Sequence, residues 1–201
     1  MTILTLVRHG ETDWNRDGRI QGTTDIPLND TGRGQARATG IALRQTLDTR
    51  APVVIASSDL SRAAETADLI AAELGAPEPA RYPGLRERAY GEAEGMRAAD
   101  FRVRWGDWHT SEIPGAESWD DLRDRALLTL RRVVADARRT TAPVAPALVV
   151  VAHGALIREL IRHATGGDLP LPGERLPNGS THTFLLERER VRLLSYLGVI
   201  V

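Results

Sequence analysis

The chain has 201 residues, of which 42% are hydrophobic and 26% are charged, and its formal net charge is −1. This length and balance are typical of one globular domain with a substantial core. The near-neutral charge gives no indication of a nucleic-acid or anionic-membrane surface, and the lack of cysteine excludes a disulfide framework, a thiolate metal site and a cysteine nucleophile.

All 26 basic residues are arginine. The lack of lysine excludes Schiff-base chemistry, a phosphate-binding loop of the Gly-Lys-Ser/Thr kind and the catalytic lysine of kinases. Any phosphate site in this chain must therefore use the arginine guanidinium, which can hold two phosphate oxygens at once.

The first predicted element is a strand over residues 3–7, which is apolar apart from Thr5. Such a run is typical of a strand buried on both faces of a parallel sheet. It ends in Arg8, His9 and Gly10, and open α/β sheets bind their ligands at the carboxyl ends of strands. A fixed cation beside an imidazole favours an anion and can support nucleophilic or proton-transfer chemistry.

A loop is predicted over residues 13–27, where glycine and proline interrupt the pattern. The next helix is predicted over residues 32–47, with Asp30 or Thr31 as its N-terminal cap. The residues of this helix that we expect to face the core are Ala38, Ile41, Ala42 and Leu43.

A second buried strand is predicted over residues 52–56, and it ends in Ser57 and Ser58. Arg62 follows near the start of a helix that runs to about Leu74. This second strand end therefore also brings an arginine to the beginning of a helix, which is a place suited to anions.

Residues 77–115 have an irregular pattern, and we expect a lid-like insertion around residues 90–115. A helix follows, with Ser118 and Asp121 placed as a capping box. The apolar residues at helical spacing in it are Trp119, Leu122, Ala126, Leu130 and Val133.

The most apolar strand is predicted over residues 147–152, and it ends in His153 and Gly154. A helix over residues 155–165 follows at once. This strand end therefore repeats the His-Gly pair that follows the first strand.

Two short strands, over residues 181–186 and 191–196 with a turn at 187–190 between them, are predicted to close the sheet. The alternation of strands and helices predicts an α/β fold, a three-layer α/β/α sandwich with a mainly parallel central sheet. We expect a single domain over residues 1–201.

Three predicted strands thus end in groups that suit an anion. If these strands are parallel neighbours, Arg8, His9, Arg62 and His153 converge on one crevice at the same edge of the sheet. One histidine after a strand is more often structural. Two strand-His-Gly endings together with a strand followed by serines and an arginine are hard to obtain by chance.

The sequence over residues 6–15 resembles the signature of the histidine phosphatase superfamily, which has the phosphoglycerate mutase-like fold. Further matching segments follow in the same order and extend the resemblance over nearly the whole chain. They are residues 21–22, 25–28, 31–36, 57–63, 85–91 with Gly95, and 152–154.

This resemblance implies that His9 is the nucleophile and becomes a phosphohistidine. It implies that Arg8, Arg62 and His153 line the phosphate pocket and contribute to catalysis, and that Asn15 donates a hydrogen bond to the phosphate. Charge on the oxygens of a phosphoryl group in transfer is well matched by such donors. The further residues that the resemblance places at the phosphate or substrate site are Gln21, Gly22 and Gly154.

Glu87 has two interpretations. Its spacing alone favours an ion pair with Arg86 or Arg88 on a solvated loop. The resemblance implies instead that Glu87 protonates the leaving group and then acts as the base for the hydrolytic water. Glu11 and Asp59 are expected to hold loops and arginines in place.

Within the superfamily, the resemblance favours the phosphatase branch. Mutases typically carry a small residue where this chain has Gln21, an asparagine where it has Ala155, and an arginine pair in an insertion longer than residues 90–115. Residues 114–118 also look like the phosphatase branch. We therefore predict a phosphomonoester hydrolase, with a cofactor-dependent phosphoglycerate mutase and a non-catalytic phospho-ligand-binding protein as alternatives.

His109, His163 and His182 lack the spacing of metal ligands, so we predict no metal and no cofactor. Trp105 and Trp108 either cover the leaving group or pack the lid down, and packing is the favoured alternative.

The predicted partner is a small-molecule phosphomonoester, with no nucleic acid and no membrane. The C-terminal strand is free to pair between subunits, which leaves a homodimer as an open alternative. Because the first strand begins almost at Met1 and no apolar run could span a bilayer, we expect a cytoplasmic protein.

Overall fold

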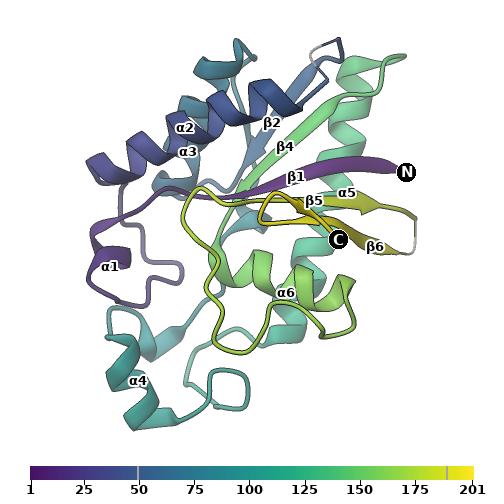
Figure 1. Ribbon diagram of the computed structural model, residues 1–201. Helices are drawn as coiled ribbons and strands as arrows, with labels where there is room; N and C mark the ends of the chain where they lie inside the picture. The colour runs from purple at the N-terminus through teal and green to yellow at the C-terminus, as the bar shows by residue number, and fades with distance from the viewer. Residues whose placement is uncertain (49, 189) are drawn as a thin grey trace.

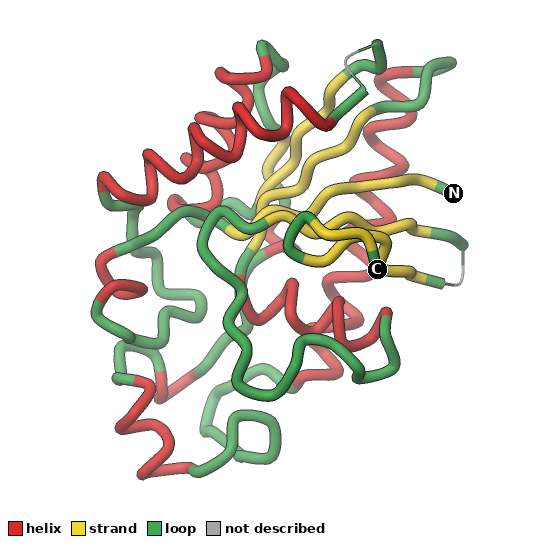
Figure 2. Tube along the Cα trace, in the orientation of Figure 1, coloured by secondary structure: helices red, strands yellow, loops and turns green. Residues whose placement is uncertain are grey.

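The computed structural model describes residues 1–48, 50–188 and 190–201. Its centre is a seven-stranded sheet with the strand order β3-β2-β4-β1-β5-β6-β7, shown in yellow in Figure 2. The strands are β1 (Thr2–Arg8), β2 (Val53–Ser57), β3 (Ala80–Arg81), β4 (Ala147–Ala152), β5 (Thr181–Leu186), β6 (Val191–Tyr196) and β7 (Val199–Ile200). The strands β3, β2, β4 and β1 pair in parallel, whereas β5, β6 and β7 join through antiparallel pairs.

Helices cover both faces of this sheet (Figure 1). The helices of the described residues are α1 (Asp13–Arg16), α2 (Asp30–Thr46), α3 (Ser61–Leu74), α4 (Ala98–Trp105), α5 (Trp119–Thr141) and α6 (Gly154–Ala164), with short 3₁₀ helices at Pro83–Leu85 and Gly91–Ala93. Apolar residues of α2 and α3 pack on one face of the sheet, and those of α5 and α6 pack on the other. The predicted three-layer α/β/α fold is therefore confirmed, with a sheet that is parallel on one side and antiparallel on the other.

Alternation of side chains along the central strands divides them between the two cores. Leu4 and Leu6 of β1 face the α5 and α6 layer, whereas Val7 faces the α2 and α3 layer. Because both faces of β1 are buried, the strand needs the nearly continuous apolar sequence from which it was predicted.

The predicted inner face of α2 is wrong for three of its four residues. Leu43 is buried as expected, but Ile41 is 42% exposed, Ala38 and Ala42 are exposed as well, and the helix buries Thr39 and Gly40 in their place. A Cβ atom on Gly40 would lie only 2.7 Å from the Cβ atom of Glu73 in α3. The helix therefore turns its small residues toward α3 because they permit close packing, a preference that a count of apolar residues does not detect.

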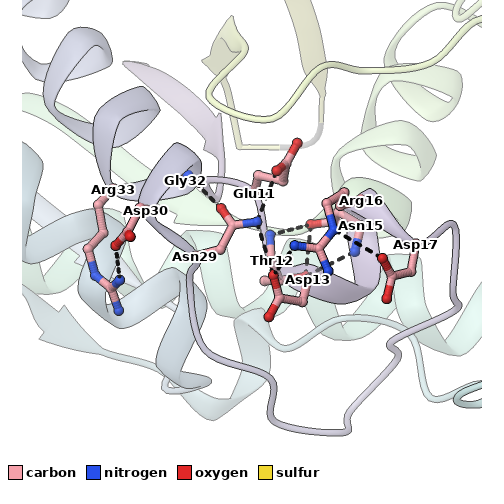
Figure 3. Close-up of polar contacts among 10 residues, drawn as sticks. All are labelled: Glu11, Thr12, Asp13, Asn15, Arg16, Asp17, Asn29, Asp30, Gly32 and Arg33. Carbon is pink, nitrogen blue, oxygen red and sulfur yellow. Dashed lines mark hydrogen bonds and ion pairs between the residues drawn. The ribbon is translucent and has the colours of Figure 1, made fainter.

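The cap of α2 also differs from the prediction. The side chain of Asn29, rather than Asp30 or Thr31, accepts a hydrogen bond from the Gly32 N–H at 2.9 Å (Figure 3). The residues that precede the apolar face offered three adjacent polar side chains, and only the backbone geometry decides which of them lies outside the helix.

Some short elements were not predicted. The 13–27 loop begins with α1, and the irregular 77–115 segment contains β3 and α4. These elements are too short to show a period in the sequence. The predicted turn at 187–190 includes Glu189, which lies outside the described residues.

The backbone of the loop that follows β1 is in direct contact with the backbone at the start of α2. A Cβ atom on Gly10 would lie 2.3 Å from the Gly32 carbonyl oxygen, and one on Gly32 would lie 2.1 Å from the Glu11 carbonyl oxygen. The Gly10 N–H donates to the Thr66 hydroxyl at 3.0 Å. The backbone beside His9 is therefore fixed from two sides.

Gly10→Ala is expected to lower the free energy of unfolding by about 3 kcal/mol, because the new methyl group meets backbone atoms that cannot move aside. The matched control is Gly34→Ala on the exposed side of α2, where a Cβ atom meets nothing within 4 Å. That change should raise stability by about 0.5–1 kcal/mol. Urea denaturation followed by circular dichroism measures both, and equal stability of the two variants would show that the crossing is not tight.

Candidate active site

The two histidines that follow β1 and β4 lie side by side. These strands are parallel neighbours in which Arg8 pairs with Ala152, so His9 and His153 come next at the same edge of the sheet. The His9 N–H donates to the Ala152 carbonyl at 3.0 Å, and the two imidazole ring centroids are 5.2 Å apart. The predicted juxtaposition of His9 and His153 is therefore present.

One nitrogen of the His9 ring is committed to a backbone contact. Its Nδ1 atom lies 2.7 Å from the Gly10 carbonyl oxygen, which can only accept, so Nδ1 carries the proton. The lone pair of the neutral ring is then on Nε2. Burial, followed by the charges of Arg62 and Arg8, holds the pKa of His9 well below its ordinary value. The ring is therefore neutral and able to act as a nucleophile at neutral pH.

Two buried guanidinium groups lie at this site. Arg62 is completely buried, and its terminal nitrogens donate to the carbonyl oxygens of Thr24 at 2.9 Å and Gly22 at 2.7 Å. Arg8 donates to the Leu176 carbonyl. Burial lowers the pKa of Arg8 to about 10, with a smaller opposing effect of Glu87, and burial also lowers the pKa of Arg62. Both groups remain charged at neutral pH.

Several buried nitrogen atoms at the site have no hydrogen-bond partner among the described residues. Within the described residues, the Nε atoms of Arg8 and Arg62 and both ring nitrogens of His153 form no hydrogen bond. Buried polar groups are nearly always paired, so such a cluster indicates the position of a ligand. Because the guanidinium groups are cations, the expected ligand is an anion.

His153 is as strongly affected by its surroundings as His9. It is fully buried, and burial, followed by the charge of Arg62, holds its pKa well below the ordinary value. Gly154 comes next, and a Cβ atom there would lie 3.3 Å from the Arg8 Nε atom. Glycine at this position therefore leaves space around the Arg8 guanidinium.

The loop that contains Gln21 and Gly22 closes another side of the site. The Gln21 side chain is buried and accepts from the Thr12 hydroxyl at 3.0 Å. Gly22 has φ +58°, a left-handed conformation that favours glycine, and it supplies a carbonyl oxygen to Arg62. Gly22 thus contributes to the site indirectly, because its carbonyl oxygen orients the Arg62 guanidinium.

Glu94 holds this loop in place, and sequence reasoning missed it. Its carboxylate accepts from the backbone N–H groups of Thr23 and Thr24 at 2.9 Å and from their hydroxyls. Burial alone would raise the pKa of Glu94, but these hydrogen bonds lower it. Sequence pattern gives no signal for contacts between segments 70 residues apart.

Asn15 is oriented through its side-chain oxygen. The Oδ1 atom accepts from the Thr12 N–H at 3.2 Å, and the Thr12 hydroxyl caps the short helix α1 by accepting from the Asn15 N–H (Figure 3). A second donor to Oδ1 comes from Asn178 at 3.2 Å. Asn178 was also missed by sequence reasoning, because it lies in a polar loop with no periodic pattern.

Glu87 lies at the start of α6. Its carboxylate accepts from the backbone N–H groups of Arg88 and Ala155 at 2.9 Å and of Leu156 at 3.1 Å. The interpretation of Glu87 as a partner of Arg86 or Arg88 on a solvated loop is wrong, because Glu87 is buried. The carboxylate is therefore next to the helix that begins directly after His153.

Two other acidic residues hold loops, as expected. Asp59 accepts two hydrogen bonds from the Arg86 guanidinium, at 2.8 and 2.5 Å, which ties the start of α3 to the loop of Glu87. Glu11 accepts from the Asn29 side chain at 2.9 Å, which ties the loop after β1 to the cap of α2 (Figure 3).

The tryptophans of the 90–115 segment pack that segment down. Trp108 stacks on Phe101 with ring centroids 4.0 Å apart and packs edge-on against Tyr90 at 5.9 Å. Trp105 packs on Phe101 at 5.4 Å. The same apolar cluster includes Ala155 at the start of α6, so this segment lies against the helix beside the site.

The remaining histidines lie outside this pocket. The His109 ring is within 3.2 Å of the Arg162 guanidinium, and His182 contacts the Ser180 hydroxyl. Among the described residues, no group of three or more His, Cys, Asp or Glu side chains could hold a metal ion. Nor does the described part of the chain contain a helix with the length and apolar character needed to cross a membrane.

Comparison with known proteins agrees with this geometry. A Bacillus subtilis protein named as an uncharacterised phosphatase, PhoE, is 37% identical over 98% of this chain and 94% of its own length. A Beijerinckia indica 2,3-bisphosphoglycerate-dependent phosphoglycerate mutase is 33% identical over 90% of this chain and 87% of its own length. The solved structure of a mycobacterial glucosyl-3-phosphoglycerate phosphatase in complex with VO3 is 29% identical, covers 98% of this chain and 99% of that one, and has a TM-score of 0.78.

The family model described as the histidine phosphatase superfamily (branch 1) matches residues 4–197. Together with the phosphatases among the relatives, this match confirms the prediction of a phosphatase enzyme. The chain therefore belongs to branch 1 of the histidine phosphatase superfamily.

Proposed function

We propose that this protein hydrolyses small-molecule phosphomonoesters through a phosphohistidine formed on His9. The observation that carries the proposal is the cluster of buried, unpartnered nitrogen atoms of Arg8, Arg62 and His153 within the described residues. It lies beside a neutral imidazole whose Nε2 lone pair is free. A phosphate with its negative oxygens satisfies these donors and brings phosphorus to the nucleophile.

In the first step, the His9 Nε2 atom attacks phosphorus while the bond from phosphorus to the ester oxygen breaks. The His9 Nδ1 proton stays in its hydrogen bond to Gly10. Arg8 and Arg62 stabilise the charge that spreads over the equatorial oxygens, because preorganised donors in a buried site need no rearrangement during the reaction. The negative charge of the bound phosphate also favours a proton on His153, which then becomes a further donor.

The departing ester oxygen takes a proton from Glu87. The Glu87 Oε2 atom accepts one hydrogen bond, from Ala155, whereas Oε1 accepts two, so Oε2 has room for the proton. In the second step, the Glu87 carboxylate takes a proton from water. The water oxygen attacks phosphorus, the bond from phosphorus to Nε2 breaks, and inorganic phosphate leaves with His9 restored.

The mutase alternative is supported by the phosphoglycerate mutase among the relatives. It requires that the site retain a bisphosphorylated intermediate. Gln21 is buried and bonded to Thr12 at the position where mutases typically carry a small residue. We therefore favour release of the phosphorylated intermediate to water over isomerisation.

Incubation with 3-phosphoglycerate, with and without 2,3-bisphosphoglycerate, tests this choice. We expect release of inorganic phosphate in both reactions and little 2-phosphoglycerate. Efficient isomerisation without net phosphate release would establish the mutase instead. A panel of aryl and alkyl phosphates ranked by kcat/KM would identify the leaving group. If none of them is hydrolysed and no acid-labile phosphoprotein is trapped, the protein binds phospho-ligands without turnover.

A further inference from the structure

The side chain of Asn178 donates a hydrogen bond just beyond the last backbone hydrogen bonds between β1 and the segment that leads into β5. Strands β1 and β5 pair in antiparallel fashion up to Val7 and Thr181. The Arg8 N–H then donates to the Ser180 carbonyl, and the Gly179 N–H donates to the Arg8 carbonyl, both at 3.0 Å. For His9, which follows the last residue of β1, the donor is the Asn178 side-chain nitrogen, which lies 2.9 Å from the His9 carbonyl oxygen.

The same nitrogen has a second acceptor. Asn178 Nδ2 lies 3.2 Å from the Asn15 Oδ1 atom, which also accepts from Thr12. The donors of Thr12 and Asn178 that point at Oδ1, which are the Thr12 N–H and hydroxyl and the Asn178 NH₂ group, determine which end of the Asn15 amide is oxygen and which is nitrogen. The Asn15 NH₂ group is therefore kept away from these donors and available to an anion.

The segment that carries Asn178 is itself anchored. The yellow-green connection between α6 and β5 returns to the carboxyl end of β1 (Figure 1). The Gly179 carbonyl accepts from the Thr39 hydroxyl of α2 at 3.0 Å, and Gly179 has φ +77°. Asn178 is thus supported by both β1 and α2, so it can hold its two acceptors at a fixed spacing.

We propose that Asn178 is a positioning residue for phosphoryl transfer, an inference that rests on the proposed function. With one NH₂ group it fixes the backbone of the nucleophile His9 and the orientation of the Asn15 amide. The His9 imidazole and the Asn15 NH₂ group are thereby oriented toward the same phosphoryl group. Misplacement of catalytic groups by about 1 Å can cost about 10²-fold in rate, so loss of this support is expected to slow the reaction.

A double-mutant cycle on the full chain tests the proposal, with p-nitrophenyl phosphate as substrate and inorganic phosphate as competitive inhibitor. Asn15→Ala should lower kcat/KM by about 10²-fold. Asn178→Ala should lower it by at least about 10-fold and weaken phosphate inhibition. The double variant should lose clearly less than the product of the two single losses, because Asn178 acts partly through Asn15. Asp168→Ala, in the same connecting segment and exposed, should leave kcat/KM unchanged.

Asn178→Asp separates hydrogen-bond donation from filling of space. It keeps the size of the side chain but places an oxygen against two acceptors, so it should lose at least as much activity as Asn178→Ala. The inference is wrong if Asn178→Asp restores activity or if Asn178→Ala keeps wild-type kcat/KM. It is also wrong if the loss of kcat/KM in the double variant agrees within about 2-fold with the product of the two single losses. If neither variant folds by circular dichroism, Asn178 is a structural residue and the inference is also wrong. If the wild-type protein shows no turnover and no phosphoprotein can be trapped on it, the proposed function itself is wrong.

Discussion

Replacement of His9 by alanine is expected to abolish both turnover and phosphoprotein formation. In the proposed mechanism the lone pair of the His9 Nε2 atom accepts the phosphoryl group. The surrounding arginines cannot replace it, because a charged guanidinium group has no lone pair to donate. By analogy with removal of the nucleophile from a protease, kcat should fall by about 10⁶-fold. The measurement is phosphate release from p-nitrophenyl phosphate, together with acid-quench trapping of radiolabelled phosphoprotein.

The matched control is His163→Ala, which removes an exposed imidazole from the last turn of α6. That variant should keep wild-type kcat and the same trapped phosphoprotein. Circular dichroism should show that His9→Ala remains folded, because its side chain lies in the pocket rather than in an apolar core. Turnover by His9→Ala at a wild-type rate would remove the phosphohistidine mechanism.

Glu87→Gln is expected to lower kcat by about 10²–10⁴-fold for an alkyl phosphate such as 3-phosphoglycerate. An alkoxide leaves poorly without a proton, and glutamine cannot supply one. The loss should be much smaller for formation of the phosphoenzyme from p-nitrophenyl phosphate, because p-nitrophenolate leaves without protonation. Rapid-quench kinetics of the first turnover with both esters measures this difference.

The control for this variant is Glu92→Gln, an exposed residue of the same region that pairs with Arg104. It should leave both reactions unchanged. Glu87 also caps α6, so Glu87→Gln should lower stability by about 1 kcal/mol. Equal losses with the two esters would indicate that the variant disturbs α6 rather than proton transfer, and would argue against Glu87 as the acid.

The sequence was sufficient to predict the elements that hold the central residues of the site. Strands β1 and β4 are long apolar runs, and the carboxyl ends of parallel strands must share one edge of the sheet. That rule alone brings His9 beside His153. Arg62 follows because it lies in the first turn of the helix after the neighbouring strand.

The supports of the site were not predictable in the same way. Glu94 and Asn178 act through side-chain hydrogen bonds to segments distant in sequence, and nothing near them repeats with a helical or strand period. The face of α2 depends on how closely Gly40 can approach Glu73, which is a property of two helices rather than of one. Periodicity therefore locates strands and the residues at their ends. Tertiary contacts determine which face of a helix is buried, which residue caps it and which distant side chains support the site.

The position of β1 in the sheet has a consequence for synthesis of the protein. This strand is made before its neighbours β4 and β5, which come from residues 147–152 and 181–186. A growing chain on the ribosome therefore carries an apolar strand without its partners until those later residues have been made, and unpaired apolar strands of this kind are prone to aggregation. Because the pocket also draws on Asn178, hydrolytic activity should arise only after residue 178 has been made and its segment has paired with the end of β1.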